Sequence, residues 1–247
     1  MASPTVVLIT GISRGLGHEL AAAYLLRPNH TVIGSVRDAV KAGDLKQLPT
    51  AEDSRLILVT IENTSTTDAN KAAEEIEAAG IDHIDIVIAN AAISHAPAPL
   101  DTIDTETMVD AFRINTISAV LLFQAIHKLL ANASAPKWIS VSSRRGSISQ
   151  PAGFYWIIAP YGMSKAALHW FTTAINTAIE SLTAFVVHPG SMHTDMGVEA
   201  ARLEGRDRPP VDPRDSAARI IRVIDGATKE EIGGKLVDVT TGEVYPW

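Results

Sequence analysis

The sequence contains no cysteine, no tract of basic residues and no basic segment followed by an apolar one at its beginning. Without cysteine there is no disulfide, thiol nucleophile or thiolate metal site, and His95, His188 and His193 are too scattered to bind a metal together. The formal net charge is −7 with acids and bases interspersed, which argues against a nucleic-acid partner. The first apolar run, Val6 to Ile9, is too short for a signal peptide or a membrane span. We therefore expect a soluble cytoplasmic protein with no membrane partner.

Apolar segments with the period of strands alternate with segments of helical period along the chain. The 247 residues are 46% hydrophobic and 20% charged, which suits one compact domain with a large core and leaves room for two small ones. Strands are expected at Val6–Ile9, Thr31–Val36, Arg55–Ile61, Ile84–Ala89, Lys137–Val141, Thr183–Val187 and Leu236–Val239. Helices are expected at Thr67–Ala79, Met108–Leu130, Tyr161–Glu180 and Ser216–Ile224, and the polar segment Val198–Pro213 is expected to be a loop or mobile lid. This alternation predicts an α/β fold with a doubly wound parallel sheet of about seven strands.

A glycine-rich turn follows the first expected strand. In Thr10–Gly17 the glycines have the spacing G-x-x-x-G-x-G, and a pattern of helical period begins directly after them. Glycines allow a tight turn and close approach of the backbone to a ligand, and a helix N-terminus offers free N–H groups to a phosphate. The turn therefore predicts a dinucleotide-binding site, and a structural turn without a ligand is the alternative.

Arg37 stands at the end of the second expected strand, about 20 residues beyond the glycine turn, where a dinucleotide fold places the residue that reads the adenosine ribose. An acid there accepts the 2′-hydroxyl of NAD, whereas an arginine suits the 2′-phosphate of NADP. Arg14 in the turn can approach the same phosphate, and Asp38, one residue further on, is the argument for NAD. We expect NADPH or NADP ahead of NAD. The alternative is that Arg37 is a solvated loop residue.

Polar residues follow the later strands, at the edge where open α/β sheets bind ligands. Glu62 and Asn63 come after the third strand and either contact an adenine or only form a turn. Asn90 and Ala91 come after the fourth, where small residues let the backbone approach a flat ligand and where Asn90 can equally lock the sheet through side-chain hydrogen bonds. Ser143 ends the fifth strand, and a hydroxyl there fits either a site or an ordinary turn.

Asn115 lies inside the expected helix Met108–Leu130, in an otherwise apolar neighbourhood. Asparagine is a poor helix former, and a buried amide needs hydrogen-bond partners. The side chain could cap a bent turn, hold a water or do both.

Tyr161 and Lys165 are four residues apart at the head of an apolar-periodic segment. Residues four apart share one face of a helix, so phenol and ammonium would lie side by side. A nearby cation favours the phenolate, and we expect it to lower the pKa of Tyr161 and to ease proton donation to a carbonyl oxygen. For the pair alone, a lysine stem packed against a ring is the alternative. Tyr155 has Ala159 four residues on and therefore no lysine partner.

In their chain order, these motifs resemble the short-chain dehydrogenase/reductase family over nearly the whole chain. The motif T-G-x-x-x-G-x-G matches Thr10–Gly17, Y-x-x-x-K matches Tyr161 and Lys165, and P-G-x-x-x-T matches Pro189, Gly190 and Thr194. The family's strand-terminal serine falls on Ser143, and its asparagine in the long helix falls on Asn115. The resemblance implies a single-domain Rossmann-type fold over residues 1–247, with a variable substrate loop around residues 190–213.

The resemblance also implies an NADPH-dependent reductase of a small-molecule ketone or aldehyde. Tyr161 would be the general acid, and Lys165 would hold the nicotinamide ribose and lower the tyrosine pKa. Ser143 would hydrogen-bond the substrate carbonyl, and Asn115 would hold a relay water behind Lys165. The implied cofactor-binding residues are Gly11, Ser13, Arg14, Gly15, Leu16, Gly17, Arg37, Glu62, Asn63, Asn90, Ala91, Tyr161, Lys165, Pro189, Gly190, Met192 and Thr194, the last two at the carboxamide side of the nicotinamide.

Three features depart from the family's pattern. Ala92 stands where glycine is common, and Glu62 is one methylene longer than the usual acid. Ser143 and Tyr161 are further apart than in typical members, and the extra length carries the apolar segment Phe154–Ile158. This insert suits a bulky, apolar or aromatic ketone, or else packs on a neighbouring subunit or on the core.

Two other functions stay open. One is a dinucleotide-binding regulatory protein without catalysis, and the other is an NAD-dependent alcohol dehydrogenase. Because family members often pair through their two long helices, a homodimer or homotetramer formed by Met108–Leu130 and Tyr161–Glu180 is a further expectation.

Overall fold

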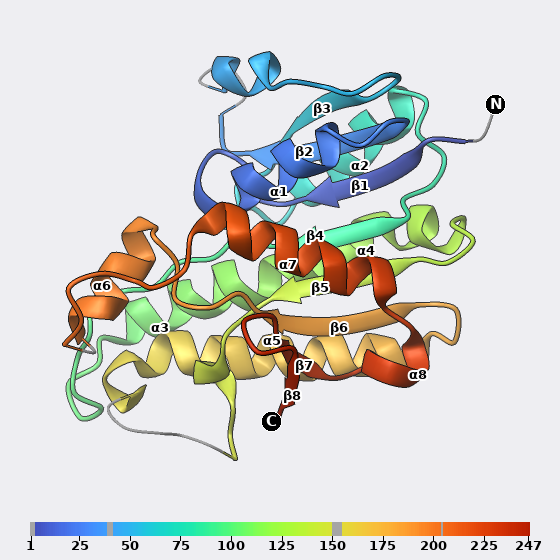
Figure 1. Cartoon of the computed structure of the whole chain (residues 1–247). Helices are drawn as coiled ribbons and strands as arrows, with labels where there is room; N and C mark the ends of the chain where they lie inside the picture. The colour runs from blue at the N-terminus through green and yellow to red at the C-terminus, as the bar shows by residue number, and fades with distance from the viewer. Residues whose placement is uncertain (1–2, 39–41, 150–154, 204) are drawn as a thin grey trace.

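The fold is built on one sheet of eight strands in the order β3-β2-β1-β4-β5-β6-β7-β8 (Figure 1). It comes from a computed structural model that describes residues 3–38, 42–149, 155–203 and 205–247. The strands are β1 (Thr5–Ile9), β2 (His30–Val36), β3 (Arg55–Thr60), β4 (Ile86–Ala89), β5 (Lys137–Val141), β6 (Thr183–His188), β7 (Leu236–Asp238) and β8 (Glu243–Tyr245). Strands β1 to β7 pair in parallel, and β8 pairs with β7 in the antiparallel sense. The predicted doubly wound parallel sheet is confirmed, and β8 is an addition to it.

Alternate residues of β1 enter two different cores. Val7 and Ile9 pack in the core beneath α1 and α7, whereas Val6 and Leu8 pack in the core beneath α2, α4 and α5. Since side chains alternate between the two faces and both faces are covered, the strand is apolar throughout. These helices are α1 (Gly15–Leu25), α2 (Asp68–Ala78), α4 (Ser118–Ala131), α5 (Ala159–Ala178) and α7 (Pro213–Gly226).

The strand order reverses between β1 and β4. From β1 the sheet grows outward through β2 and β3 on one side and through β4, β5 and β6 on the other. In open α/β sheets a ligand crevice forms beyond the carboxyl ends of the strands at such a switch point. The segments that follow β1, β4, β5 and β6 therefore converge on one edge.

The predicted helix over residues 108–130 is confirmed as a continuous run with a wide turn inside it. It consists of α3 (Thr105–Phe112), a π-helical turn η2 (Arg113–Ile117) and α4. Asn115 is at the centre of the wide turn and is buried. By length and composition alone the run could cross a bilayer, but its buried side chains pack in the core beneath the sheet.

The segment Val198–Pro213, expected to be a loop or mobile lid, is helical at its beginning because α6 spans Asp195–Leu203. Thr194 caps this helix, since its Oγ1 accepts a hydrogen bond from Gly197 N at 3.2 Å and its carbonyl accepts one from Val198 N at 2.8 Å. Ala201 is buried. The loop prediction is wrong for residues 198–203. The polar residues there indicated a loop, but the cap and a few inward positions are enough to fix a helix.

Candidate functional site

The glycine turn between β1 and α1 has the conformation that its sequence predicts. Gly11 and Gly15 have φ values of +72° and +59°, in the left-handed region that favours glycine. A Cβ on Gly17 would lie 2.3 Å from the Gly11 carbonyl oxygen, so the first turn of α1 packs directly on the loop. Within the described part of the chain no side chain caps the N-terminus of α1, which leaves its first N–H groups available to an anion. The cradle fits the pyrophosphate of a dinucleotide.

Asn90 and Thr10 lock this turn to the end of β4. Asn90 Nδ2 donates to the Thr10 carbonyl at 2.9 Å, and Thr10 Oγ1 accepts from the backbone N–H groups of Asn90 and Ala91 at 2.9 and 3.0 Å. Gly11 approaches Ala91 so closely that a Cβ on Gly11 would lie 3.2 Å from Ala91 Cα. The locking role left open for Asn90 is therefore present in the structure.

The predicted cofactor-binding residues of the glycine turn and at the end of β2 differ in exposure. Arg37 is exposed at the end of β2, and Arg14 forms an exposed ion pair with Asp195 of α6. Ser13 is exposed in the glycine turn, and Leu16 points into the core beneath α1. Because both partners of the Arg14 pair are exposed, the pair contributes little and can exchange its partner for a phosphate.

Glu62 and Asn63 have different surroundings in the structure. Glu62 Oε1 accepts a hydrogen bond from Thr64 N at 3.3 Å, so its carboxylate serves a turn, as one of the two interpretations had it. Asn63 lines a small cavity that also reaches Thr10, Ala91 and Asn115.

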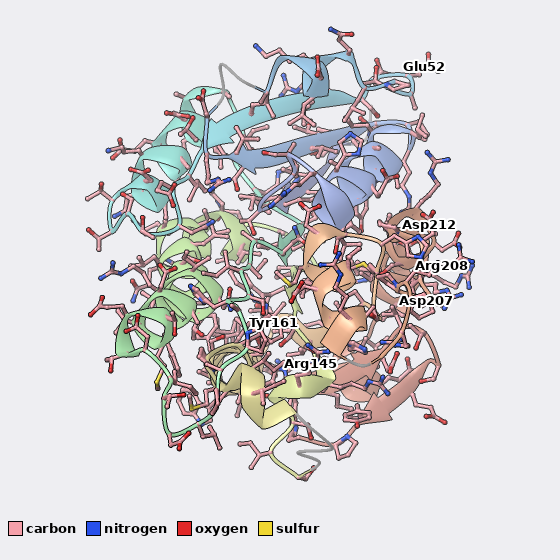
Figure 2. All side chains as sticks on the ribbon, turned by 90° about the vertical axis from the view of Figure 1, so that its left-hand side faces the viewer. Glu52, Arg145, Tyr161, Asp207, Arg208 and Asp212 are labelled. Carbon is pink, nitrogen blue, oxygen red and sulfur yellow. The ribbon has the colours of Figure 1, made fainter. Side chains whose placement is uncertain are left out.

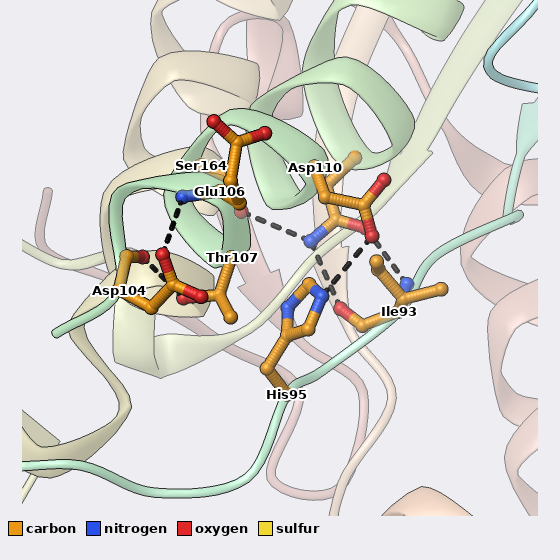
Figure 3. Close-up of polar contacts among 8 residues, drawn as sticks. Ile93, His95, Asp104, Glu106, Thr107, Asp110 and Ser164 are labelled. Atoms are coloured by element: carbon orange, nitrogen blue, oxygen red, sulfur yellow. Dashed lines mark hydrogen bonds and ion pairs between the residues drawn. The ribbon is translucent and has the colours of Figure 1, made fainter.

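Asn115 joins the loop after β4 to α5. Its Nδ2 donates to the Ile93 carbonyl and to Ser164 Oγ, both at 3.0 Å, and its Oδ1 accepts from Ile93 N at 2.8 Å. Ser164 Oγ in turn donates to the Tyr161 carbonyl at 2.8 Å. Figure 3 shows Ile93 and Ser164 brought together in this way. Both hydrogens of the Asn115 side-chain amide are used in hydrogen bonds, so this amide holds the bent turn as expected. The relay water stays a prediction.

Tyr161 and Lys165 lie one turn apart at the start of α5, with Lys165 Nζ 5.7 Å from the centroid of the tyrosine ring. Lys165 is 2% exposed, and its Nζ donates to the Val141 carbonyl at the end of β5 at 2.9 Å. Burial lowers the pKa of Lys165 to about 7. The alternative of an exposed lysine stem packed against the ring is excluded, because Lys165 is buried.

The expected fall in the tyrosine pKa is not what the structure shows. Burial raises the pKa of Tyr161 above its ordinary value, and the charge of Arg145 and a hydrogen bond from Ser143 oppose this rise. The prediction was wrong because it considered the lysine four residues away and could not include the burial of the phenol. The cation that acts on the phenol is Arg145, from the turn after β5.

Ser143 occupies the end of β5 in extended backbone, and its Oγ accepts a hydrogen bond from Arg145 N at 3.2 Å. Its neighbour Ser142 bonds instead to His169 Nε2 of α5 at 2.7 Å. The 3-10 turn η3 (Arg144–Gly146) lies directly on α5, since a Cβ on Gly146 would lie 2.9 Å from Ala166 N. This close packing places the Ser143 hydroxyl beside the phenol of Tyr161.

A cavity of about 830 Å³ opens at this edge of the sheet. Seven of the predicted site residues line it: Arg14, Ser143, Tyr161, Pro189, Gly190, Met192 and Thr194. Gly190 has φ +88°, and the Pro189 carbonyl accepts a hydrogen bond from Ser216 Oγ at 2.8 Å, which together set the course of the chain after β6. Lys165 lies behind the cavity wall, and Asn115 lines the smaller cavity instead.

The apolar insert is described only in part, since Phe154 lies outside the described residues. Residues Tyr155–Ile158 form the 3-10 turn η4, which leads directly into α5. Ile158 is buried and lines the large cavity, and the Ile157 carbonyl accepts a hydrogen bond from Ala98 N at 2.8 Å. At Ile158 the insert therefore borders the cavity.

The cavity also contains residues that the sequence motifs did not identify, namely His95, Arg144, Arg145 and His188. His188 is the last residue of β6 and the other three follow β4 or β5, so a place at or beyond the carboxyl end of a strand was the available signal. Burial lowers the pKa of His188 to about 4, so this ring is neutral at pH 7. His95 Nε2 lies 3.1 Å from Asp110 Oδ2 of α3, a contact that Figure 3 shows. Among the described residues, no three His, Asp or Glu side chains are grouped to hold a metal ion.

Comparisons with known proteins agree with this geometry. The family model described as short chain dehydrogenase matches residues 5–204. The chain is 45% identical to the short-chain dehydrogenase srdF of Neurospora crassa, covering 98% of each, and 37% identical to the norsolorinic acid ketoreductase stcE of Emericella nidulans, covering 98% of this chain and 94% of the relative. Among solved structures, an NADPH-bound carbonyl reductase from chicken fatty liver superposes with a TM-score of 0.84 at 25% identity over 100% of both chains.

Proposed function

Because the chain belongs to the short-chain dehydrogenase family, whose members are oxidoreductases that use NAD or NADP, we propose that it is an NADPH-dependent ketoreductase. The observation that carries this proposal is the convergence of Ser143 and Tyr161 on one cavity, with Lys165 buried one helical turn beyond the phenol. The names of the relatives support the same chemistry, since they include a ketoreductase and a carbonyl reductase.

Each residue then has a defined task. Ser143 donates a hydrogen bond to the carbonyl oxygen and holds it at the phenol, and Tyr161 donates its proton to that oxygen as negative charge develops there. The phenol of Tyr161 carries its proton at neutral pH, and the charge of Arg145 and the hydrogen bond from Ser143 oppose the rise in its pKa that burial causes, which eases release of that proton. NADPH, when bound, supplies the hydride, and the glycine turn and Lys165 position it. The size of the cavity and its apolar border at Ile158 suit a bulky or aromatic ketone.

The test is consumption of NADPH by the purified protein with a panel of aliphatic and bulky aromatic ketones, with NADH in parallel. We expect turnover with NADPH that is fastest for the bulky aromatic members. If neither nucleotide is consumed with any ketone although NADPH binds, the reductase proposal is wrong, and the chain is a dinucleotide-binding protein without this chemistry.

Arg37→Ala should separate the two nucleotides. The guanidinium would pair with the 2′-phosphate, which NADH lacks, so we expect the KM for NADPH to rise about tenfold or more while that for NADH changes little. Initial rates with both nucleotides measure this. Asp38→Ala is the counterpart, because an acid that reads a 2′-hydroxyl affects NADH instead. An equal rise for both nucleotides in Arg37→Ala would show that Arg37 does not read the phosphate.

A further inference from the structure

The turn η3 places two arginines at the large cavity, and proton transfer to a ketone does not require either of them. Arg144 and Arg145 directly follow Ser143, and both line the cavity. Including Arg14 and Arg206, the described lining has four arginines against the two acids Asp195 and Glu199. The cavity that holds the proposed proton donor is thus rich in positive charge, although the protein carries a net charge of −7.

The charge of Arg144 is compensated by the protein itself. Its Nε lies 3.6 Å from the carboxylate of Asp238, whose side chain is 3% exposed, and its guanidinium lies 5.5 Å from the centroid of the Tyr245 ring. Arg144 therefore ties η3 to β7 and β8.

Arg145 is fixed by its backbone between the two residues that would handle the carbonyl oxygen. Its N–H donates to Ser143 Oγ at 3.2 Å, and its carbonyl oxygen lies so close to α5 that a Cβ on Gly162 would approach it to 3.0 Å. The side chain is half-buried and lines the same cavity as Tyr161, on whose phenol its charge acts, and Figure 2 labels the two residues near one another. A group bound by this guanidinium would therefore sit next to the reacting carbonyl.

We propose that Arg145 binds an anionic oxygen of the substrate, so that the enzyme selects ketones carrying a carboxylate or an ionised hydroxyl near the carbonyl. This inference rests on the proposed reductase function and names its substrate class. A guanidinium presents a planar set of N–H donors that matches a carboxylate or a phenolate, and such charge-assisted hydrogen bonds strengthen where water is partly excluded. The apolar part of the substrate then lies against Ile93, Ile158 and Met192, which line the same cavity.

The test uses pairs of aryl ketones in which methylation removes the anionic charge and adds one methyl group. One pair is an acetyl-substituted benzoate and its methyl ester, and the other is an acidic hydroxyaryl ketone and its methyl ether. For the wild type we expect kcat/KM to favour the anionic member of at least one pair by about 10-fold to 100-fold, the range for a hydrogen bond to a charged group. A preference in the first pair identifies a carboxylate as the anion, and a preference in the second identifies an ionised hydroxyl.

Arg145→Met should abolish this preference while the neutral ketones are still reduced, and Arg145→Lys should keep part of it. Arg144→Met is the matched control, because it removes the same charge from the neighbouring residue but leaves Arg145 in place, and it should keep the preference. An equal loss for anionic and neutral ketones in Arg145→Met would overturn the inference, because Arg145 would then act on Tyr161 and not on the substrate. No preference in the wild type for either pair would overturn it as well.

A binding measurement tests the anion site independently of the reductase proposal. Calorimetric titration of the same ketones into the protein with NADP⁺ should show tighter binding of the anionic member, and Arg145→Met should remove the difference. If no ketone is turned over but this Arg145-dependent preference in binding is present, the reductase proposal fails and the anion site stands. If binding shows no preference, the anion site fails whatever the turnover.

Discussion

Tyr161→Phe is expected to lower kcat by about 10²-fold to 10⁴-fold while the affinity for NADPH changes little. The phenol is the group that we propose as the proton donor, and general acid catalysis by a positioned side chain contributes an effect of this size. Phenylalanine keeps the ring next to Lys165 Nζ and removes only the hydroxyl. Steady-state rates and nucleotide binding by fluorescence give the two quantities separately.

Tyr24→Phe is the matched control for this variant. Tyr24 is buried in the core beneath α1, and its hydroxyl has no hydrogen-bond partner among the residues that the structure describes, so its removal should leave turnover unchanged. If Tyr161→Phe kept a rate within a few-fold of the wild type, then Tyr161 would not be the proton donor and the reductase mechanism would need another acid.

Lys165→Met is expected to abolish turnover and yet to stabilise the cofactor-free protein at neutral pH. The pKa of Lys165 falls from 10.5 to about 7 because the ammonium is buried, which corresponds to as much as about 5 kcal/mol. Methionine fills a similar volume without a charge. It also leaves the Val141 carbonyl without its donor, which costs about 1–3 kcal/mol. We therefore expect a net gain of about 2 kcal/mol in the free energy of unfolding at pH 6.

The pH dependence distinguishes this explanation from a packing effect. Between about pH 7 and 10.5 the unfolded wild type keeps a proton on Lys165 that the folded form has released, so wild-type stability rises with pH across this window. The advantage of Lys165→Met should thus be full below about pH 7, shrink above it, and reverse near pH 10. Urea unfolding at pH 6, 8 and 10 measures this, with the exposed Lys71→Met as a control. A difference that stays constant with pH would show that the lysine carries no buried charge at neutral pH.

The order of the elements could be predicted from local patterns, but the direction of several side chains could not. The strand Lys137–Val141 and the glycine turn have the predicted positions because β-branched runs and glycine spacing are properties of neighbouring residues. The short strand β8 was missed because its residues are half-buried or exposed, and its pairing with β7 depends on a contact across the sheet. The sign of the Tyr161 pKa shift was missed for the same reason, since burial of the phenol depends on segments distant in sequence.

In the candidate site, too, local motifs predicted some positions, and contacts between distant segments set the others. Ser143, Tyr161 and Gly190 could be placed at one edge because each follows a recognisable motif, and all three line the cavity. Arg145 was visible in the sequence next to Ser143. Its position beside the phenol depends on how closely η3 packs on α5, which no local pattern records.

The π-helical turn at Asn115 sets the direction in which α3 faces relative to α4 about the helix axis. A wide turn accommodates one residue more than an α-helical turn does, and one residue corresponds to about 100° of rotation about the helix axis. This offset lets Asp110 of α3 face His95 at the cavity while Asn115 faces Ser164 of α5. If the same residues formed a regular α-helix, α3 would rotate by about 100° relative to α4 and turn away from its partners. Deletion of a single residue between 113 and 117 would instead keep α3 in phase with α4 and remove the wide turn in which Asn115 sits.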